Sequence, residues 1–230
     1  MRRIIRASAL AVWTAASLVT AAAGPALPAE CGETSVRLLT SGENRSLPPG
    51  TVAVLVRGAI AAPLAEELER LLERIERYDT VILDLDSAGG ELAYAERVSA
   101  GLGKLRERVL LRTYVRHGSA CLSSCVLVFM QGEERVAGGA SAWLFHGVCR
   151  AFATLPLPRE TARFVELLAA AGVSGAFLAS IEGYLNAPGE FWLSGYELHA
   201  VREAGIITTL LAPWRPLHPS FRSPPGTDPG

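Results

Sequence analysis

The stretch that decides the fold is Gly118–Cys125, with the sequence GSACLSSC, followed at once by the apolar run Val126–Met130. Small residues crowd Ser123 directly before residues that can start a helix. A serine at a strand-to-helix turn has its hydroxyl exposed and its neighbours out of the way, which is one way hydrolases present a nucleophile. The sequence therefore makes Ser123 a candidate nucleophile, with Ser124 as its nearest rival.

Two further motifs flank this stretch. Ser87–Gly90 (SAGG) follows an apolar run, and a diglycine turn after a strand can offer a free backbone N–H to an oxyanion. His146 ends the apolar run Ala142–Phe145 and can serve as a base, whereas His117 is closer to the serine but lies in a basic loop. Each motif alone also fits a helix cap, a tight turn or a buried strand-end histidine. Their order and spacing together predict a Ser/His site.

Strands and helices alternate around these motifs. Apolar runs predict strands at 52–56, 80–85, 109–115, 142–145 and 206–211, and amphipathic or capped segments predict helices at 63–78, 91–105, 126–130, 158–172, 174–185 and from 194 until Gly205. This alternation favours right-handed crossovers and an α/β fold with a largely parallel sheet. Catalytic residues are then expected at the carboxyl ends of strands, where Gly90 and Ser123 fall.

The two ends of the chain differ in composition from its middle. Residues 1–29 have the basic start, Ala-rich apolar run and small residues of an export signal, with cleavage expected after Ala29 or Ala23. Removing them lowers Lys+Arg from 22 to 19 against 23 acidic residues, for a net charge of about −4. Residues 30–212 are then one domain, and the proline-rich residues 213–230 a disordered tail.

This organisation predicts a periplasmic or secreted protein without a membrane span after cleavage. Lys and Arg are dispersed along the chain, which argues against a nucleic-acid partner.

Four cysteines lie beyond the signal, so export would bring them into an oxidising compartment. They are Cys31, Cys121, Cys125 and Cys149. A Cys121–Cys125 bridge across the nucleophile turn is slightly favoured over the alternative, in which Cys125 is a buried thiol and Cys31 pairs with Cys149. No second cysteine pair or histidine cluster suggests zinc, so neither a metal nor a cofactor is expected.

Taken together, Ser87–Gly90, Cys121–Gly132 and Phe145–His146 resemble the Clp-protease/crotonase superfamily. They are most similar to exported Clp-protease-like proteins of Gram-negative bacteria, which carry a Cys-x-Ser-Ala-Cys signature. The Clp proteolytic subunit has a Ser-Pro-Gly-Gly turn. Its nucleophilic serine is followed by a glycine and then by the histidine that acts as the base. Here the glycine is nine residues beyond Ser123 and the histidine 23 residues beyond it. The resemblance implies a spiral of repeated β-β-α units with a largely parallel sheet and a helical C-terminal part.

The resemblance also implies roles for individual residues. Ser123 matches the nucleophile and His146 the base, while Gly90 and Ser124 match the backbone donors of the oxyanion hole. Two departures are that Ala88 replaces the proline of the turn and Ser124 the alanine of the signature.

The triad aspartate of the family has no clear equivalent. Counting back from Phe191–Ser194 places Asn186 near its position, with Glu182 and Glu190 close by. The expected protein is an exported serine hydrolase, in particular a peptidase acting on peptides or proteins, and the resemblance suggests a homo-oligomer. The alternatives are a non-catalytic binding or scaffold protein on the same fold, and acyl-thioester chemistry, which export disfavours.

Overall fold

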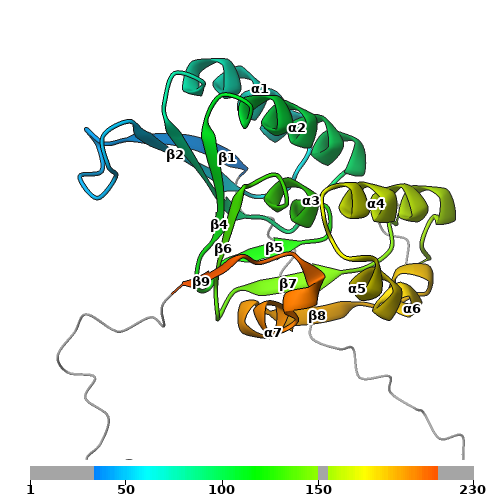
Figure 1. Ribbon diagram of the computed structural model, residues 1–230. Helices are drawn as coiled ribbons and strands as arrows, with labels where there is room; N and C mark the ends of the chain where they lie inside the picture. Colours follow the sequence, from blue (N-terminus) through cyan, green and yellow to red (C-terminus); the bar gives the residue numbers. More distant parts are fainter. Residues whose placement is uncertain (1–33, 150–154, 212–230) are drawn as a thin grey trace, which may run out of the picture. The chain divides into compact units, whose positions relative to one another are not determined.

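The computed structural model describes residues 34–149 and 155–211 (Figure 1). The expected export signal, Cys31 and the expected proline-rich tail lie outside these ranges. No helix within the two ranges is long and apolar enough to span a membrane.

The larger of two sheets has six strands in the order β1-β2-β3-β4-β6-β9. All neighbouring strands are parallel except β1 and β2, which confirms the expected α/β fold with a largely parallel sheet. The strands are β1 Ser35–Thr40, β2 Thr51–Arg57, β3 Thr80–Asp86, β4 Leu110–Val115, β6 Glu134–Gly138 and β9 Thr209–Leu211.

A second sheet of three strands follows the order β5-β7-β8. It consists of β5 Ala120–Leu122, β7 Ala142–Phe145 and β8 Phe191–Ser194, with β5 and β7 parallel and β8 antiparallel to β7. A single bridge between Ser87 and Cys121 connects the end of β3 to β5. The expectation of one sheet was therefore incomplete, and strands β1, β5, β6 and β8 were not predicted.

Helices α1 (Ala62–Ile75) and α2 (Leu92–Leu105) lie together along one face of the larger sheet (Figure 1). Pro63 fits the first turn of α1, where no backbone N–H is needed. The apolar side of α1 is buried through Leu64, Ala65, Leu68, Leu71 and Ile75. Burying one of the leucine or isoleucine side chains stabilises the fold by about 1.5–3 kcal/mol.

The remaining helices are α3 Cys125–Phe129, α4 Pro158–Ala170, α5 Gly175–Ser180, α6 Glu182–Asn186, α7 Gly195–Ala200 and a 3-10 turn at Arg202–Ala204. The helix expected over 174–185 is divided, because buried Ile181 leaves the helical conformation with φ −104° and ψ 2°. The capping box of Ser194 and Glu197 starts α7 as predicted.

The fold brings three strand ends together. The diglycine turn follows β3, Ser123 follows β5, and His146 follows β7. Since β5 is bridged to the end of β3 and paired in parallel with β7, the segments that leave these strands emerge side by side.

Candidate active site

Ser123 has an unusual backbone conformation. Among the described residues, it is the non-glycine residue with a positive φ, 53°. A left-handed conformation costs a residue with a Cβ atom roughly 1–2 kcal/mol, so the surroundings must hold it. The Ser123 N–H donates to the Leu144 carbonyl at 2.8 Å, and the Ser123 carbonyl accepts from Val126 N–H at 3.0 Å. This sharp turn between β5 and α3 is the geometry predicted for a nucleophile.

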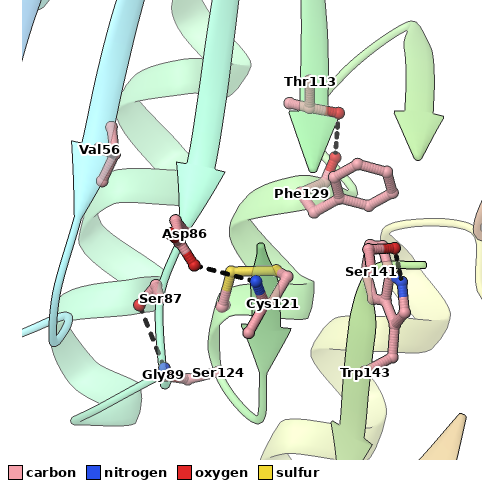
Figure 2. The surroundings of a disulfide bond; sticks show 12 residues. Val56, Asp86, Ser87, Gly89, Thr113, Cys121, Ser124, Phe129, Ser141 and Trp143 are labelled. Carbon is pink, nitrogen blue, oxygen red and sulfur yellow. Dashed lines mark hydrogen bonds between the residues drawn. A yellow bond between two sulfur atoms is a disulfide. The ribbon is translucent and has the colours of Figure 1, made fainter. Parts of the chain in front are cut away.

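A disulfide between Cys121 and Cys125 closes the same turn (Figure 2). Both residues are fully buried, and their Cα atoms are 5.2 Å apart. The structure thus has the bridge that the sequence slightly favoured. Cys149 is a free thiol, and Cys31, its partner in the alternative pairing, lies outside the described residues.

The diglycine turn packs directly against the turn that contains Ser123. Gly89 has a φ of 83°, and a Cβ atom there would lie 2.5 Å from the Leu122 carbonyl oxygen and 2.9 Å from the Ser123 Cβ. The Gly89 N–H donates to Ser87 Oγ at 3.1 Å (Figure 2). Ser87 also accepts from Leu122 N–H at 3.0 Å through its carbonyl. Glycine is therefore required at position 89 by both its φ and its neighbours.

Two backbone N–H groups are available at this junction. The Gly89 carbonyl accepts from Ile60 N–H at 2.7 Å, and in a trans peptide the next N–H, that of Gly90, points the opposite way. The Ser123 carbonyl accepts from Val126 N–H, so the Ser124 N–H, in the same peptide group, points away from α3. Within the described ranges neither N–H has a hydrogen-bond acceptor. A pair of unengaged donors beside a serine is what an oxyanion site requires.

A small cavity of about 50 Å³ joins these groups to His146. It is lined by Gly90, Leu92, Ser123, Ser124, His146, Val148, Cys149 and Phe164. His146 is half-buried, and its Nδ1 lies 2.7 Å from the Gly147 carbonyl oxygen. Because a carbonyl only accepts, Nδ1 carries the proton and Nε2 is left as the basic nitrogen. No hydrogen bond joins His146 to Ser123 among the residues described here.

Asn186 is not brought to His146. It is exposed at the end of α6 and lines a different cavity, of about 610 Å³, between α4, α5 and α6. The structure therefore gives no contact for the suggested role of Asn186 in orienting the histidine.

Glu190 is the acidic residue that reaches the surroundings of His146. Both line a cavity of about 310 Å³ together with Gly147, Cys149, Pro156, Ala187, Pro188 and Gly189. Phe145 pairs with Phe191 in the antiparallel β7–β8 ladder, so His146 and Glu190 are the next residues in the same register. Glu190 accepts from Trp192 Nε1 at 2.9 Å. Recognising β8 in the sequence would have identified this carboxylate.

Other polar residues near these strand ends have structural contacts. Asp84 is fully buried and forms ion pairs with Arg116 at 2.6 Å and Arg57 at 3.3 Å. Asp86 Oδ1 accepts from Ala120 N–H at 2.9 Å at the start of β5. His117 Nδ1 accepts from Ala140 N–H at 3.3 Å, outside the cavity that holds Ser123.

No protein-family model matches the sequence, and no curated protein matches it. Solved structures do match. ClpP1 from Listeria monocytogenes superimposes with a TM-score of 0.55 and 20% identity, over 71% of this chain and 92% of that chain. A mutant of the same protein gives 0.54 and 18%, over 69% and 90%. A mutant of the membrane-bound stomatin-specific protease 1510-N gives 0.54 and 13%, over 69% and 77%.

These similarities establish the fold. The chain has the α/β fold of the ClpP-like proteases, as the sequence resemblance implied.

Proposed function

We propose that this protein is a serine hydrolase, in particular a peptidase, that works by acyl transfer at Ser123. The observation that carries the proposal is the convergence on one cavity of four groups: Ser123 at positive φ, His146, and the unengaged N–H groups of Gly90 and Ser124. A turn without a catalytic role would still need the glycines. It would not need a half-buried histidine and two unengaged N–H groups beside the serine.

In the proposed reaction, Ser123 Oγ attacks the carbonyl carbon of the substrate as His146 Nε2 accepts the hydroxyl proton. The negative charge that forms on the carbonyl oxygen is stabilised by the N–H groups of Gly90 and Ser124. One such donor is worth about 3 kcal/mol of activation free energy. His146 then returns the proton to the leaving amine, and an acyl-enzyme remains. Water, deprotonated by His146, attacks this ester and releases the acid with the serine restored.

Two groups assist His146 in this scheme. The Gly147 carbonyl fixes the tautomer, since it accepts the Nδ1 proton at 2.7 Å. Gly147 is itself confined, because a Cβ atom there would overlap the Leu185 carbonyl and Pro156. Glu190 supplies the negative charge that a neutral carbonyl lacks, and it would stabilise the imidazolium formed during attack. We therefore assign to Glu190 the place for which the sequence suggested Asn186.

The proposed substrates are peptides or proteins in the periplasm or the medium. The export-type composition of residues 1–29 supports the location, and the fold shared with proteases supports the substrate class. Acyl transfer at a serine requires no cofactor or metal. A homo-oligomer is part of the same proposal.

A fluorophosphonate probe tests the proposed nucleophile. The chain is produced with its own residues 1–29, purified, and treated with the probe near pH 8, and the labelled peptide is identified by mass spectrometry. We expect label on Ser123, loss of label in Ser123→Ala, and strongly slowed labelling in His146→Ala. A folded protein that takes no label, or takes it on Ser124, would refute the assignment.

One observation favours a binding or scaffold role as the second candidate. Ser123 and His146 share a cavity in the described structure without a hydrogen bond between them. Catalytic hydrogen bonds often form fully only with substrate present, so the same geometry also fits a hydrolase. The probe experiment separates the two functions, because a scaffold would not react.

A further inference from the structure

The Ser124 side chain makes a contact that its backbone role does not require. Its hydroxyl donates to the Gly90 carbonyl at 3.1 Å, between residues 34 positions apart. Ser124 is only 3% exposed, so this hydroxyl is held inside the junction and is not a solvated surface group. Figure 2 shows Ser124 beside Gly89 at the point where the two turns meet.

We propose that the Ser124 hydroxyl is a positioning group that sets the separation of the two oxyanion donors, an inference that rests on the proposed function. Ser124 supplies one donor through its backbone N–H. Its side chain bonds to Gly90, the residue that supplies the other donor. Ser124 therefore supplies one donor through its N–H and, through its hydroxyl, holds Gly90, which supplies the other donor.

Within the described residues, the other hydrogen bonds of the diglycine turn do not reach Ser124. Ile60 accepts from Glu91 N–H at 2.9 Å and donates to the Gly89 carbonyl at 2.7 Å, which ties the turn to the segment after β2. Ser87 ties the start of the turn to β5. Among the described residues, the Ser124–Gly90 bond is the hydrogen bond that directly joins the two donor residues.

Loss of the hydroxyl should affect catalysis more than folding. Gly90 is exposed, so water can replace the hydroxyl at its carbonyl, and the free energy of unfolding changes little. Water does not restrain the distance between the two N–H groups. Preorganised donors lose much of their effect when that geometry loosens.

Ser124→Ala tests this role, with Ser99→Ala as the matched control. Ser99 is a buried serine of α2, 7% exposed, whose hydroxyl has no hydrogen-bond partner in the described part of the chain. Fluorophosphonate labelling of Ser123 at several probe concentrations gives the maximal rate and the half-saturating concentration separately. We expect Ser124→Ala to lower the maximal rate about tenfold without changing the half-saturating concentration. Ser99→Ala should match the wild type in both, and all three proteins should melt at similar temperatures.

Ser124→Thr keeps a hydroxyl and should restore part of the maximal rate that is lost in Ser124→Ala. The role is overturned if Ser124→Ala labels at the wild-type maximal rate, if only its half-saturating concentration rises, or if Ser124→Thr is as slow as Ser124→Ala. In those cases a labelled wild type leaves the proposed function standing. A folded wild type without label overturns both, because no reactive serine is then present for the hydroxyl to serve.

Discussion

Gly89 and Ser123 are packed so closely that a methyl group on Gly89 would lie 2.9 Å from the Ser123 Cβ atom. The two residues are 34 positions apart in the sequence. Both have left-handed backbones, with φ values of 83° and 53°. Each turn therefore limits how far the other can move, and a change in the diglycine turn acts directly on the candidate nucleophile.

Gly89→Ala should disturb both stability and reactivity. The new Cβ would meet the Leu122 carbonyl at 2.5 Å as well as Ser123. We expect the free energy of unfolding to fall by about 2–3 kcal/mol, measured by urea denaturation, with slower labelling of Ser123. The control is Gly103→Ala in α2, where nothing lies within 4 Å of the new atom. That variant should gain about 0.5–1 kcal/mol. Equal stability of the two variants would contradict the close packing.

Removing the Cys121–Cys125 bridge should slow the reaction of Ser123 and leave the protein folded. The bridge closes a loop with a sequence separation of only 4, for which chain entropy gives about 2 kcal/mol. Without it, the positive φ of Ser123 loses one of its restraints. We expect Cys121→Ala/Cys125→Ala to remain folded and to label Ser123 several-fold more slowly.

The same result should follow from reducing the wild-type protein. Cys149→Ala, which leaves the bridge in place, should keep the rate of the oxidised protein. Peptide mapping without reduction checks the connectivity, and a peptide joining Cys31 to Cys121 or Cys125 would show that the pairing is wrong.

Glu190→Gln should slow labelling of Ser123, whereas Asn186→Ala should not. Glu190 shares a cavity with His146, and its carboxylate would stabilise the imidazolium, while an amide of the same shape would not. Asn186 is exposed and lines a separate cavity. We expect a decrease of at least about tenfold for Glu190→Gln and a change of less than about twofold for Asn186→Ala. The opposite ranking would restore Asn186 as the residue that orients His146.

Alkylation of Cys149 should block the site. Its free thiol lines both the cavity of Ser123 and the cavity of Glu190, and its Sγ lies 3.3 Å from the Gly147 carbonyl that also binds His146. N-ethylmaleimide added there should occupy the space beside His146 and prevent labelling by the fluorophosphonate. Cys149→Ala should label normally with or without prior maleimide. If maleimide modifies Cys149 of the wild type without slowing the label, the two cavities do not form one site.

The elements defined by local pattern were predictable. The apolar runs of β2 and β3 and the amphipathic face of α1 follow from residues adjacent in sequence, and the structure confirms them. The short motifs around Ser123, Gly90 and His146 also lie within single turns. Their relative order indicated an α/β fold in which strand ends bring them together.

The unpredicted strands have little signal of their own. The β5 strand is only three residues long, and β6, with the sequence ERVAG, has no apolar alternation. Such segments become strands because partners already in the sheet supply hydrogen bonds, as β4 and β9 do for β6. The second sheet was missed because two of its three strands, β5 and β8, were not predicted.

The sequence by itself determined the alternation of strands and helices and the turns at Ser123 and at Gly89–Gly90, because these depend on neighbouring residues. Tertiary structure alone decided which acid stands near His146, because counting residues cannot account for the break at Ile181 or for the antiparallel return of β8. It also decided the cysteine pairing, which depends on the distance between Cα atoms at the turn. Both choices are made by contacts that exist only once the chain has folded back on itself.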